Sequence, residues 1–410
     1  MLGIGNGIVY PHSNLGRTAH FDGVSSILET TIGGAGDANF SFSFWFKPIG
    51  DGASAYLCGD GKPHDNFDFR LNPVNLGAGL SSILMVNGNI YIMAANATPI
   101  DGEWHNIAIY FDKDAPADFI LWYDGVVVDV LASVGSNGHA DLYRPIVFGG
   151  RHSAEYSFVG ELDQVLAFDG AINTATALVI YQRGRDENPL PSNSLVKAAL
   201  PGGVSLTHFY QMGEGTGDVP AEIYWANNTG VGKRVFIENQ VTLGGSQLGA
   251  DKIFNGGFAT GTTLGDTGSG FTINPGSHGT IAYDSGGVKL AVTSLGLPTP
   301  TLLAVAEDGS ALDIPKLRIY QLQITYVSTN FASQSLYIWE GFDTYHNYNK
   351  IDRTATGTFS HTFIQNTLAD DEFGVAMPFS NGAHITIDDL SLRQVGDGDG
   401  ALAKGSLTFK

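Results

Sequence analysis

The chain has almost no cysteine: its 410 residues include only Cys58. A single cysteine excludes an internal disulfide, so the chain is not a small secreted module held together by disulfides. Cys58 lies in a short apolar run, which predicts a buried side chain that behaves as a small hydrophobic residue.

Targeting signals are also missing. The first residues, Met1–Asn6, contain no basic cluster and no sustained apolar run, so no secretory signal peptide is visible. No stretch approaches the roughly 18 consecutive apolar residues of a membrane-spanning helix. We therefore expect no membrane insertion, and we expect synthesis and folding in a reducing cytoplasm.

Charged residues are scarce, and the basic ones are the scarcer kind. Asp, Glu, Lys and Arg make up 15% of the chain, against ~25% in ordinary globular proteins. The 41 acidic residues outnumber the 21 basic ones and leave a formal net charge of -20, which phosphate backbones would repel. This balance excludes general nucleic-acid binding. Long surface helices would need more Lys and Glu, so the composition also disfavours a helical fold.

What the chain has instead is glycine, aromatic residues and short alternating runs. Its 54 glycines are close to twice the ~7% of average usage. Phe40, Phe42, Phe44 and Phe46 recur at every second position, which puts all four on one face of a strand that must be buried. Frequent turns between short strands predict an all-β sandwich rather than βαβ units.

Two Asp-Gly pairs mark the clearest turns. Asp101–Gly102 precedes an alternating apolar strand at 107–111, and Asp124–Gly125 separates two apolar runs. Asp and Gly tolerate the positive φ angles that tight hairpin turns require, so the second pair predicts a hairpin. The remaining expected strands are at 83–86, 90–94, 119–123, 126–131, 146–148, 165–168, 320–326, 336–339, 358–363, 373–377 and 385–392.

Composition divides the chain into five parts. They are an N-terminal arm at 1–18, a first sandwich at 19–185, a linker segment with short elements at 186–249, a second sandwich at 250–395, and a Gly/Asp-rich C-terminal tail at 396–410. Helices are expected at 171–183, with Gly184 as the C-cap, and at 194–200.

Six motifs of the first sandwich follow one another in a recognisable order. They are Phe21-Asp22-Gly23, Phe42 to Pro48, Asp101 to His105, Tyr123-Asp124-Gly125, Phe148-Gly149-Gly150 and Phe158 to Asp163. This series resembles the laminin-G-like branch of the concanavalin A-like jelly rolls. In the second sandwich, Asn255 to Phe258 and Ile385 to Leu392 resemble the first and last strands of carbohydrate-binding-module jelly rolls. The resemblance implies two tandem jelly-roll β-sandwiches joined by an irregular linker segment.

The resemblance also implies a setting. Residues 208–218 resemble a segment that often accompanies laminin-G-like domains in phage proteins. The chain looks like a non-enzymatic structural component of a tailed-phage virion, assembled in the host cytoplasm and displayed on the capsid or tail as a decoration or fibre-type protein. Its implied partners are other virion proteins bound through the arm 1–18, further copies in a homo-oligomer such as a trimer, and a host surface glycan. A tail adhesin or lectin is the alternative, and a glycan hydrolase is a third hypothesis.

A structural calcium is the one cofactor that the resemblance implies. Calcium takes about six to eight oxygen ligands from converging loops. The candidate ligands are Asp22, Asp163 and Asp169 in the first sandwich, and Asn255 with Asp388 or Asp389 in the second. The alternative for Asp22, Asp163 and Asp169 is that their carboxylates stabilise turns.

The densest mixture of aromatic and polar residues is a candidate glycan site. It spans 339–350, where a strand is expected to run into a long loop, and binding residues concentrate on loops. The candidate glycan-binding residues are Asp343, Tyr345, His346 and Tyr348. A subunit interface and ordinary packing are the alternatives for this segment.

Catalysis has little support in the sequence. Hydrolases of the concanavalin fold place paired carboxylates on one strand in a Glu-x-Asp-x-x-Glu pattern. Glu161 and Asp163 have the required spacing, but Leu166 stands where the third acid would be. His105 and His152 have no Ser or Cys partner in a recognisable arrangement, and no zinc, Walker or dinucleotide motif occurs. We therefore expect no enzymatic activity.

Overall fold

The structure is a computed structural model, and every structural statement below concerns the residues that it describes. These are residues 18–32, 39–49, 55–59, 68–71, 82–87, 89–94, 101–112, 120–128, 132–134, 146–150, 158–185, 189, 193–210, 212, 222–223, 234–237, 248–253, 271–274, 279–284, 287–294, 301–304, 314–315, 318–330, 335–339, 348–352, 357–364, 373–376, 384–395, 400–404 and 407–409.

Sheet A is built around the phenylalanine-rich strand. Phe40, Phe42, Phe44 and Phe46 are all buried in one core, which confirms the prediction from their alternation. In spatial order the sheet consists of β10 (Val126–Val127), β9 (Ile120–Tyr123), β8 (His105–Asp112), β3 (Asn39–Pro48), β13 (Val159–Phe168), β1 (Ala19–Asp22) and β29 (Thr408–Phe409), with β14 (Leu206–Tyr210) also paired to β13.

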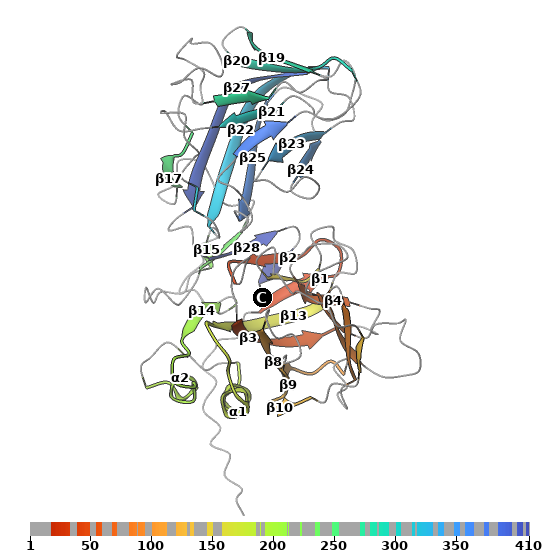
Figure 1. The fold of residues 1–410 in the computed structure, drawn as a ribbon, viewed down its shortest axis with the longest axis vertical. Helices are drawn as coiled ribbons and strands as arrows, with labels where there is room; N and C mark the ends of the chain where they lie inside the picture. Colours follow the sequence, from red (N-terminus) through yellow and green to blue (C-terminus); the bar gives the residue numbers. More distant parts are fainter. Residues whose placement is uncertain are drawn as a thin grey trace, which may run out of the picture.

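Sheet B packs against the same core from the other side. Its strands are, in spatial order, β11 (Ala132–Val134), β7 (Asn89–Ala94), β6 (Ser82–Asn87), β5 (Asp68–Leu71), β4 (Ala55–Gly59), β12 (Val147–Phe148), β2 (Ile27–Thr30), β28 (Gly400–Lys404), β16 (Arg234–Ile237) and β15 (Glu222–Ile223). Phe44 of sheet A meets Phe148 of sheet B edge to face, with ring centroids 5.2 Å apart. Cys58 is fully buried in this core, as expected. The two sheets therefore form a sandwich, which lies below the second sandwich in Figure 1.

Two helices cover part of the outer face of sheet A. They are α1 (Thr174–Arg183) and α2 (Leu195–Ala198), and they enclose a second apolar cluster with Ala108, Trp122 and Leu166 of the sheet. The first helix begins three residues later than the sequence predicts. Asn173 is its N-cap, with a side-chain oxygen that accepts a hydrogen bond from the Thr176 backbone N–H. Gly184 caps the other end at φ 78°, as predicted.

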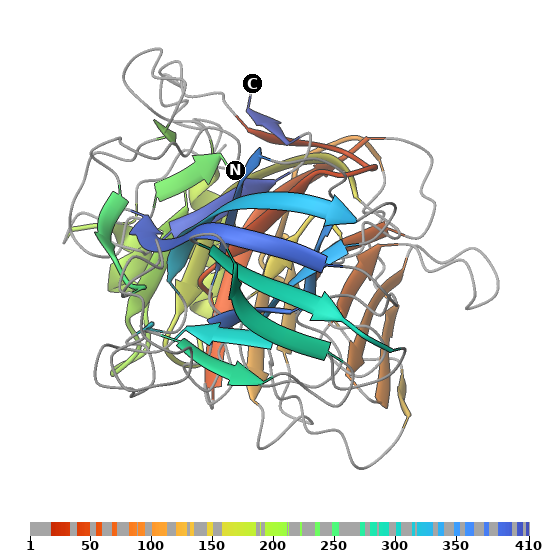
Figure 2. The same cartoon turned by 90° about the horizontal axis from the view of Figure 1, so that it is seen from above.

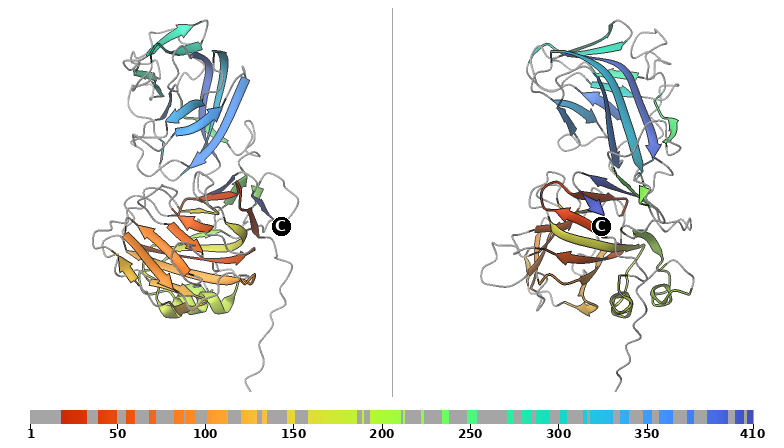
Figure 3. Two further views of the ribbon diagram at one scale, coloured as in Figure 1. Left: turned by 90° about the vertical axis from the view of Figure 1, so that its right-hand side faces the viewer. Right: turned by 180° about the vertical axis from the view of Figure 1, so that it is seen from behind.

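Residues from 248 to 395 form two further sheets. Sheet C contains β19 (Gly279–Asp284), β20 (Gly287–Val292), β27 (His384–Val395), β22 (Ile319–Asn330) and β25 (Gly357–Ile364), and β17 (Leu248–Asp251) pairs with β27. Sheet D contains β18 (Phe271–Asn274), β21 (Thr301–Ala304), β26 (Phe373–Ala376), β23 (Ser335–Trp339) and β24 (Tyr348–Asp352). Phe271 and Leu302 of sheet D share one core with Leu322 and Ile324 of sheet C, so these sheets also pack face to face. Figure 3 shows both sandwiches from two sides.

The segments predicted as linker and tail also contain strands. Residues 186–249 contribute β14 to sheet A, β15 and β16 to sheet B, and the start of β17 to sheet C. Residues 396–410 contain β28, which joins sheet B, and β29, which joins sheet A. The glycines and aspartates near 396–400 suggested a tail. Local composition does not show that β28 pairs with β2, because β2 lies far away in the sequence. Seen from above, the green-to-blue strands of the second sandwich overlie the red-to-yellow strands of the first (Figure 2).

Among the described residues, no helix is both long and apolar enough to cross a membrane.

Candidate functional site

One patch on the outer face of sheet A concentrates aromatic and charged side chains. In the ladder, Trp45 of β3 lies opposite Asn106 of β8 on one side and opposite Asp163 of β13 on the other. Residues directly opposite each other in a sheet point to the same side. Because Phe44 and Phe46 face the core, these three side chains lie on the outer face of sheet A, where neighbouring side chains cover them almost completely.

Arg185 joins the strands of this patch. Its Nη1 lies 3.2 Å from the Asp163 carboxylate, and its guanidinium lies 3.9 Å above the ring of Trp104. Asp163 is only 3% exposed, so this ion pair is shielded from water on the carboxylate side. Gly184, with its positive φ, turns the chain at the end of α1 and brings Arg185 over the sheet.

A second aromatic pair lies beside the ion pair. The rings of Trp45 and Tyr181 stack with their centroids 5.8 Å apart, and Tyr181 is 37% exposed. Trp45 Nε1 and Asn106 Oδ1 are buried atoms that have no hydrogen-bond partner within the described part of the chain. Unsatisfied buried polar atoms are costly and uncommon in native proteins, so an orphaned donor and an orphaned acceptor on opposed residues single out this site. We call Trp45, Trp104, Asp163, Tyr181 and Arg185 the outer-face patch.

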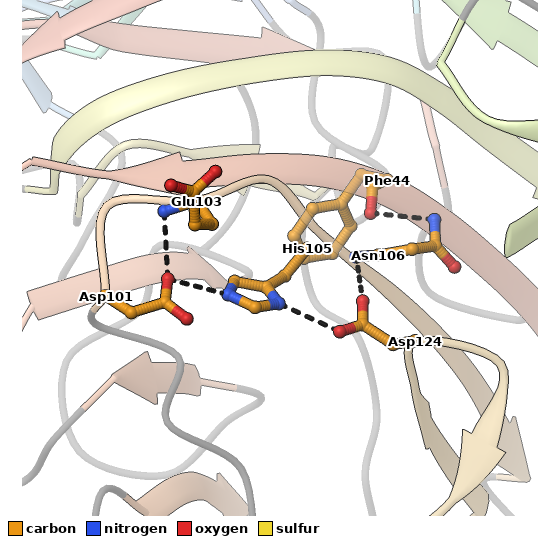
Figure 4. Close-up of polar contacts among 6 residues, drawn as sticks. All are labelled: Phe44, Asp101, Glu103, His105, Asn106 and Asp124. Atoms are coloured by element: carbon orange, nitrogen blue, oxygen red, sulfur yellow. Dashed lines mark hydrogen bonds and ion pairs between the residues drawn. The ribbon is translucent and has the colours of Figure 1, made fainter.

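A network on the opposite side of β8 fixes the loop that carries Trp104. His105 Nδ1 lies 2.9 Å from Asp124 Oδ2, and His105 Nε2 lies 2.9 Å from Asp101 Oδ1 (Figure 4). The second oxygen of Asp124 accepts the Asn106 backbone N–H at 2.8 Å, and Asp101 Oδ1 also accepts the Glu103 backbone N–H at 2.8 Å. The carboxylates therefore tie the residues on both sides of Trp104 to the hairpin at Asp124.

The electrostatics of this network favour a charged imidazole. Both ring nitrogens of His105 face a carboxylate oxygen, and only the protonated ring can donate from both. Burial by itself lowers the pKa of His105, but the hydrogen bonds to Asp124 and Asp101 and their negative charges raise it above the ordinary value overall. For Asp101, burial by itself raises the pKa. The hydrogen bonds from His105 and the Glu103 backbone N–H lower it by more, so the pKa of Asp101 lies below its ordinary value.

The Asp-Gly hairpin is confirmed. Tyr123 pairs with Val126 across a two-residue turn, in which Asp124 has φ 49° and Gly125 has φ 77°. Positive φ at both central residues is the conformation of the tight hairpin turns for which Asp-Gly is favoured. The turn places the Asp124 carboxylate against His105. The residue that forms the hairpin turn is therefore also a member of the His105 network.

The three predicted calcium ligands of the first sandwich are engaged in separate hydrogen bonds. Asp22 Oδ1 accepts the backbone N–H groups of Val24, Ser25 and Ser26 in a turn. Asp169 Oδ1 accepts the Ser205 N–H at 2.6 Å, and Asp163 is paired with Arg185. Within the described part of the chain, no three or more His, Cys, Asp and Glu side chains are grouped so as to hold a metal ion. The Asp22 carboxylate stabilises a turn, which was the alternative to calcium binding for this residue. The calcium site stays a prediction.

The predicted sites of the second sandwich lie mostly outside the described residues. This applies to Asn255, Asp343, Tyr345 and His346, and to the side chain of Tyr348, the first residue of β24. Asp388 lies half-buried on β27. The glycan platform at 343–348 therefore stays a prediction.

Sequence reasoning missed an acidic pair in the second sandwich. Burial, and then the negative charge of Asp251, raise the pKa of Asp389. Asp251 itself is held by the backbone N–H of Leu392 at 3.0 Å. The two carboxylates are far apart in the sequence and meet only through the pairing of β17 with β27.

The carboxylates with hydrolase-like spacing have other partners. Glu161 Oε2 accepts a hydrogen bond from Thr18 Oγ1 at 2.8 Å, and Asp163 is bound by Arg185. A bulge follows Asp163, where Gln164 has φ 43°. Glu161 and Asp163 are therefore both engaged in intramolecular contacts.

The outer-face patch was also missed by sequence reasoning. Trp45 and Trp104 were noticed only as parts of motifs, and Asp163 only as a candidate calcium ligand and half of a carboxylate pair. Tyr181 lay inside the helix predicted at 171–183, and Arg185 was not singled out. The alternation of Trp45 with the core phenylalanines already placed it on the opposite face, but the partner strands were not known.

A comparison with known protein families supports the fold of the first sandwich. Residues 22–176 match the family of the concanavalin A-like lectin/glucanases superfamily. This part of the chain is therefore a laminin-G-like, concanavalin A-like jelly-roll domain, as its motifs predict. No curated protein matches the chain by sequence.

Solved structures that resemble the chain include several carbohydrate-binding modules. Domain 4 of AbnA, an extracellular arabinanase from Geobacillus stearothermophilus in complex with arabinotriose, is 18% identical, with 40% of this chain and 76% of that chain covered at a TM-score of 0.30. The CBM40 of the IT-sialidase from Ruminococcus gnavus, bound to alpha2,3 sialyllactose, is 13% identical, with 40% and 97% covered at 0.30. A putative carbohydrate binding protein from Bacteroides ovatus is 13% identical, with 39% and 45% covered at 0.31.

Proposed function

We propose that the protein is a non-enzymatic, glycan-contacting structural component of a tailed-phage virion, displayed on the capsid or tail. The observation that carries the glycan-contacting part is the outer-face patch. Sugar sites combine aromatic rings, which pack against the apolar faces of the sugar, with a few polar groups that orient its hydroxyls. Trp104 and Tyr181 supply the rings, and the Arg185–Asp163 pair supplies planar donors and acceptors at their edge.

An unpaired atom of Trp45 in the patch and one of Asn106, which lies opposite Trp45, support the same proposal. A sugar hydroxyl is both a donor and an acceptor, which is the complement of the Trp45 indole N–H and the Asn106 amide oxygen. Tyr181 lies over Trp45 and is itself partly exposed. Rotamer changes of exposed side chains are fast, so a movement of Tyr181 would open the indole to a ligand.

The non-enzymatic part of the proposal rests on Asp163. A glycosidase needs a carboxylate that is free to transfer a proton or attack the sugar. The Asp163 carboxylate already accepts a guanidinium N–H on one oxygen and the Gln164 backbone N–H on the other. Its partner by spacing, Glu161, is bound by Thr18.

A glycan array with matched variants tests the glycan contact. Trp104→Ala removes the ring, Trp104→Phe keeps an aromatic face, and Val127→Ala changes an exposed residue of β10. We expect about tenfold weaker binding for Trp104→Ala, which corresponds to ~1.4 kcal/mol, and nearly unchanged binding for the other two. Unchanged melting temperatures would show that the fold is intact. Equal binding by Trp104→Ala and the parent protein would refute a role of the patch in glycan contact.

The virion part rests on the resemblance of residues 208–218 to segments of phage proteins. The first three residues of that segment, 208–210, lie in β14, which pairs with β13 in sheet A. Cryo-electron microscopy of particles from the encoding strain tests this part. Density for the two sandwiches on the capsid or tail would support it, and their absence from purified particles would refute it.

A further inference from the structure

The strand β28 contacts both sandwiches at once. It pairs antiparallel with β2 of the first sandwich, from Ile27 opposite Lys404 to Thr30 opposite Ala401. On its other side it runs parallel to β16, with Arg234 opposite Gly400. A parallel pair requires a crossover connection. Here that connection is residues 238–399, and these residues contain the whole second sandwich.

Leu402 of β28 contacts the second sandwich. It is fully buried, and its apolar cluster consists of Ile319, Ile364 and Val395, with Leu248 packed against them. These four residues belong to β22, β25, β27 and β17 of sheet C. The side chain of Leu402 therefore connects a strand of sheet B to one end of sheet C, and Figure 1 shows β28 at the junction.

Leu407 of the same C-terminal segment belongs to the other core. It is 6% exposed and lies in the cluster between sheets A and B, with Ala19 and Phe21. The strand β29, which follows Leu407, pairs with β1, with Phe409 opposite Ala19. Two leucines only five positions apart therefore serve different cores.

We propose that residues 400–404 and 407–409 act as a clasp that couples the two sandwiches mechanically. The main chain of the clasp completes the first sandwich, and Leu402 binds the second sandwich to it. The second sandwich is thus an insertion between β16 and β28 of sheet B, held at both of its connections. Unfolding or rotation of the second sandwich must break the Leu402 cluster, so the two sandwiches melt as one cooperative unit.

The two leucines provide a matched test by differential scanning calorimetry. Leu402→Ala and Leu407→Ala remove the same atoms from the same segment. We expect one transition for the parent chain, two for Leu402→Ala, and one transition at lower temperature for Leu407→Ala. Leu402→Met conserves volume and should keep the single transition. Two separate transitions in the parent chain, or the same response to both alanine variants, would overturn the clasp.

A double-mutant cycle tests the same contact if the variants do not give interpretable calorimetric transitions. Ile319→Ala is combined in turn with Leu402→Ala and with Leu407→Ala, and stability is measured by urea unfolding. Residues in contact give non-additive changes, whereas residues in separate clusters give additive ones. Non-additivity with Leu402 and additivity with Leu407 support the clasp. Additive changes in both combinations would contradict it.

Discussion

At the scale of single residues, His105 and Asp101 make the stability of the first sandwich depend on pH. The folded-state pKa of His105 is raised, so its contribution to stability is complete below the unfolded value of 6.5 and is lost as the pH rises through the folded pKa. The pKa of Asp101 is lowered, so its contribution is present above the ordinary value of 3.8 and is lost as the pH falls through the folded pKa. The network therefore stabilises most between these two limits.

The change that tests this is His105→Gln, followed by urea unfolding between pH 5 and pH 9. We expect the variant to be less stable at pH 5 by roughly 1.5–3 kcal/mol, the contribution of hydrogen bonds to a charged group. The difference should shrink as the pH rises above the folded pKa, because the parent then also has a neutral ring. Val127→Ala serves as the control, and its difference from the parent should not depend on pH. A His105→Gln difference that stays constant across the range would contradict the charged imidazole.

At the scale of elements, the turn at Gly149 after β12 depends on the absence of a side chain. Gly149 has φ 92°, and a Cβ there would overlap the Phe21 ring and lie 2.8 Å from the Ser26 carbonyl oxygen. Its N–H donates to the Leu57 carbonyl, and its carbonyl accepts the Phe158 N–H, so the backbone is fixed from two sides. The turn therefore joins β12, β4 and the start of β13 without room to adjust.

Gly149→Ala should destabilise the first sandwich by about 2–4 kcal/mol, the sum of backbone strain and overpacking. Gly102→Ala is a matched control, because Gly102 has φ 79° but nothing lies within 4 Å of an added Cβ. Its cost should be limited to backbone strain, about 1 kcal/mol. Chemical denaturation of the two variants measures the difference. Equal losses would mean that the contact with Phe21 relaxes freely.

At the scale of the whole molecule, the first described strand, β1, pairs with the C-terminal strand β29. Thr18 is buried and donates to Glu161, and Ala19 pairs with Phe409. The sequence predicts an arm at residues 1–18 that binds a neighbouring virion protein, and because Thr18 contacts Glu161, the truncation that tests docking removes only residues 1–17. Their removal should therefore leave the melting temperature unchanged while it abolishes incorporation into particles.

Immunoblots of purified particles, alongside a melting curve of the free protein, measure both effects. A variant that also lacks Thr18 is the informative control, because it removes the hydrogen bond to Glu161 and should lower the melting temperature. Normal incorporation of the chain that lacks residues 1–17 would contradict the docking role of the arm.

The parts of the fold that were predicted correctly depend on local patterns. The alternation of Phe40 to Phe46 identified a strand and its buried face, and Asp124–Gly125 identified a hairpin, because a period of two and a positive φ are properties of adjacent residues. The helix α1 was found with its C-cap, although its N-terminus was misplaced because the Asn173 cap was not considered. The laminin-G-like motifs added the architecture of the first sandwich.

The candidate site depended on contacts that no local pattern specifies. Trp45 and Asp163 are 118 positions apart, and they are opposed only because β3 pairs with β13 in one register. Arg185 reaches Trp104 only because α1 ends above that pair.

The sequence by itself determined many of the strands, the buried face of the phenylalanine-rich strand and the tight turn at Asp124–Gly125. Only the tertiary structure decided that the Gly/Asp-rich end returns to sheet B, that the second sandwich is inserted before it, and that two tryptophans, a tyrosine and an ion pair share one surface. The physical reason is that the alternation of side chains and the φ preferences act within a few residues of the chain. Strand partners and their register are instead selected by the burial of apolar surface summed over the entire chain.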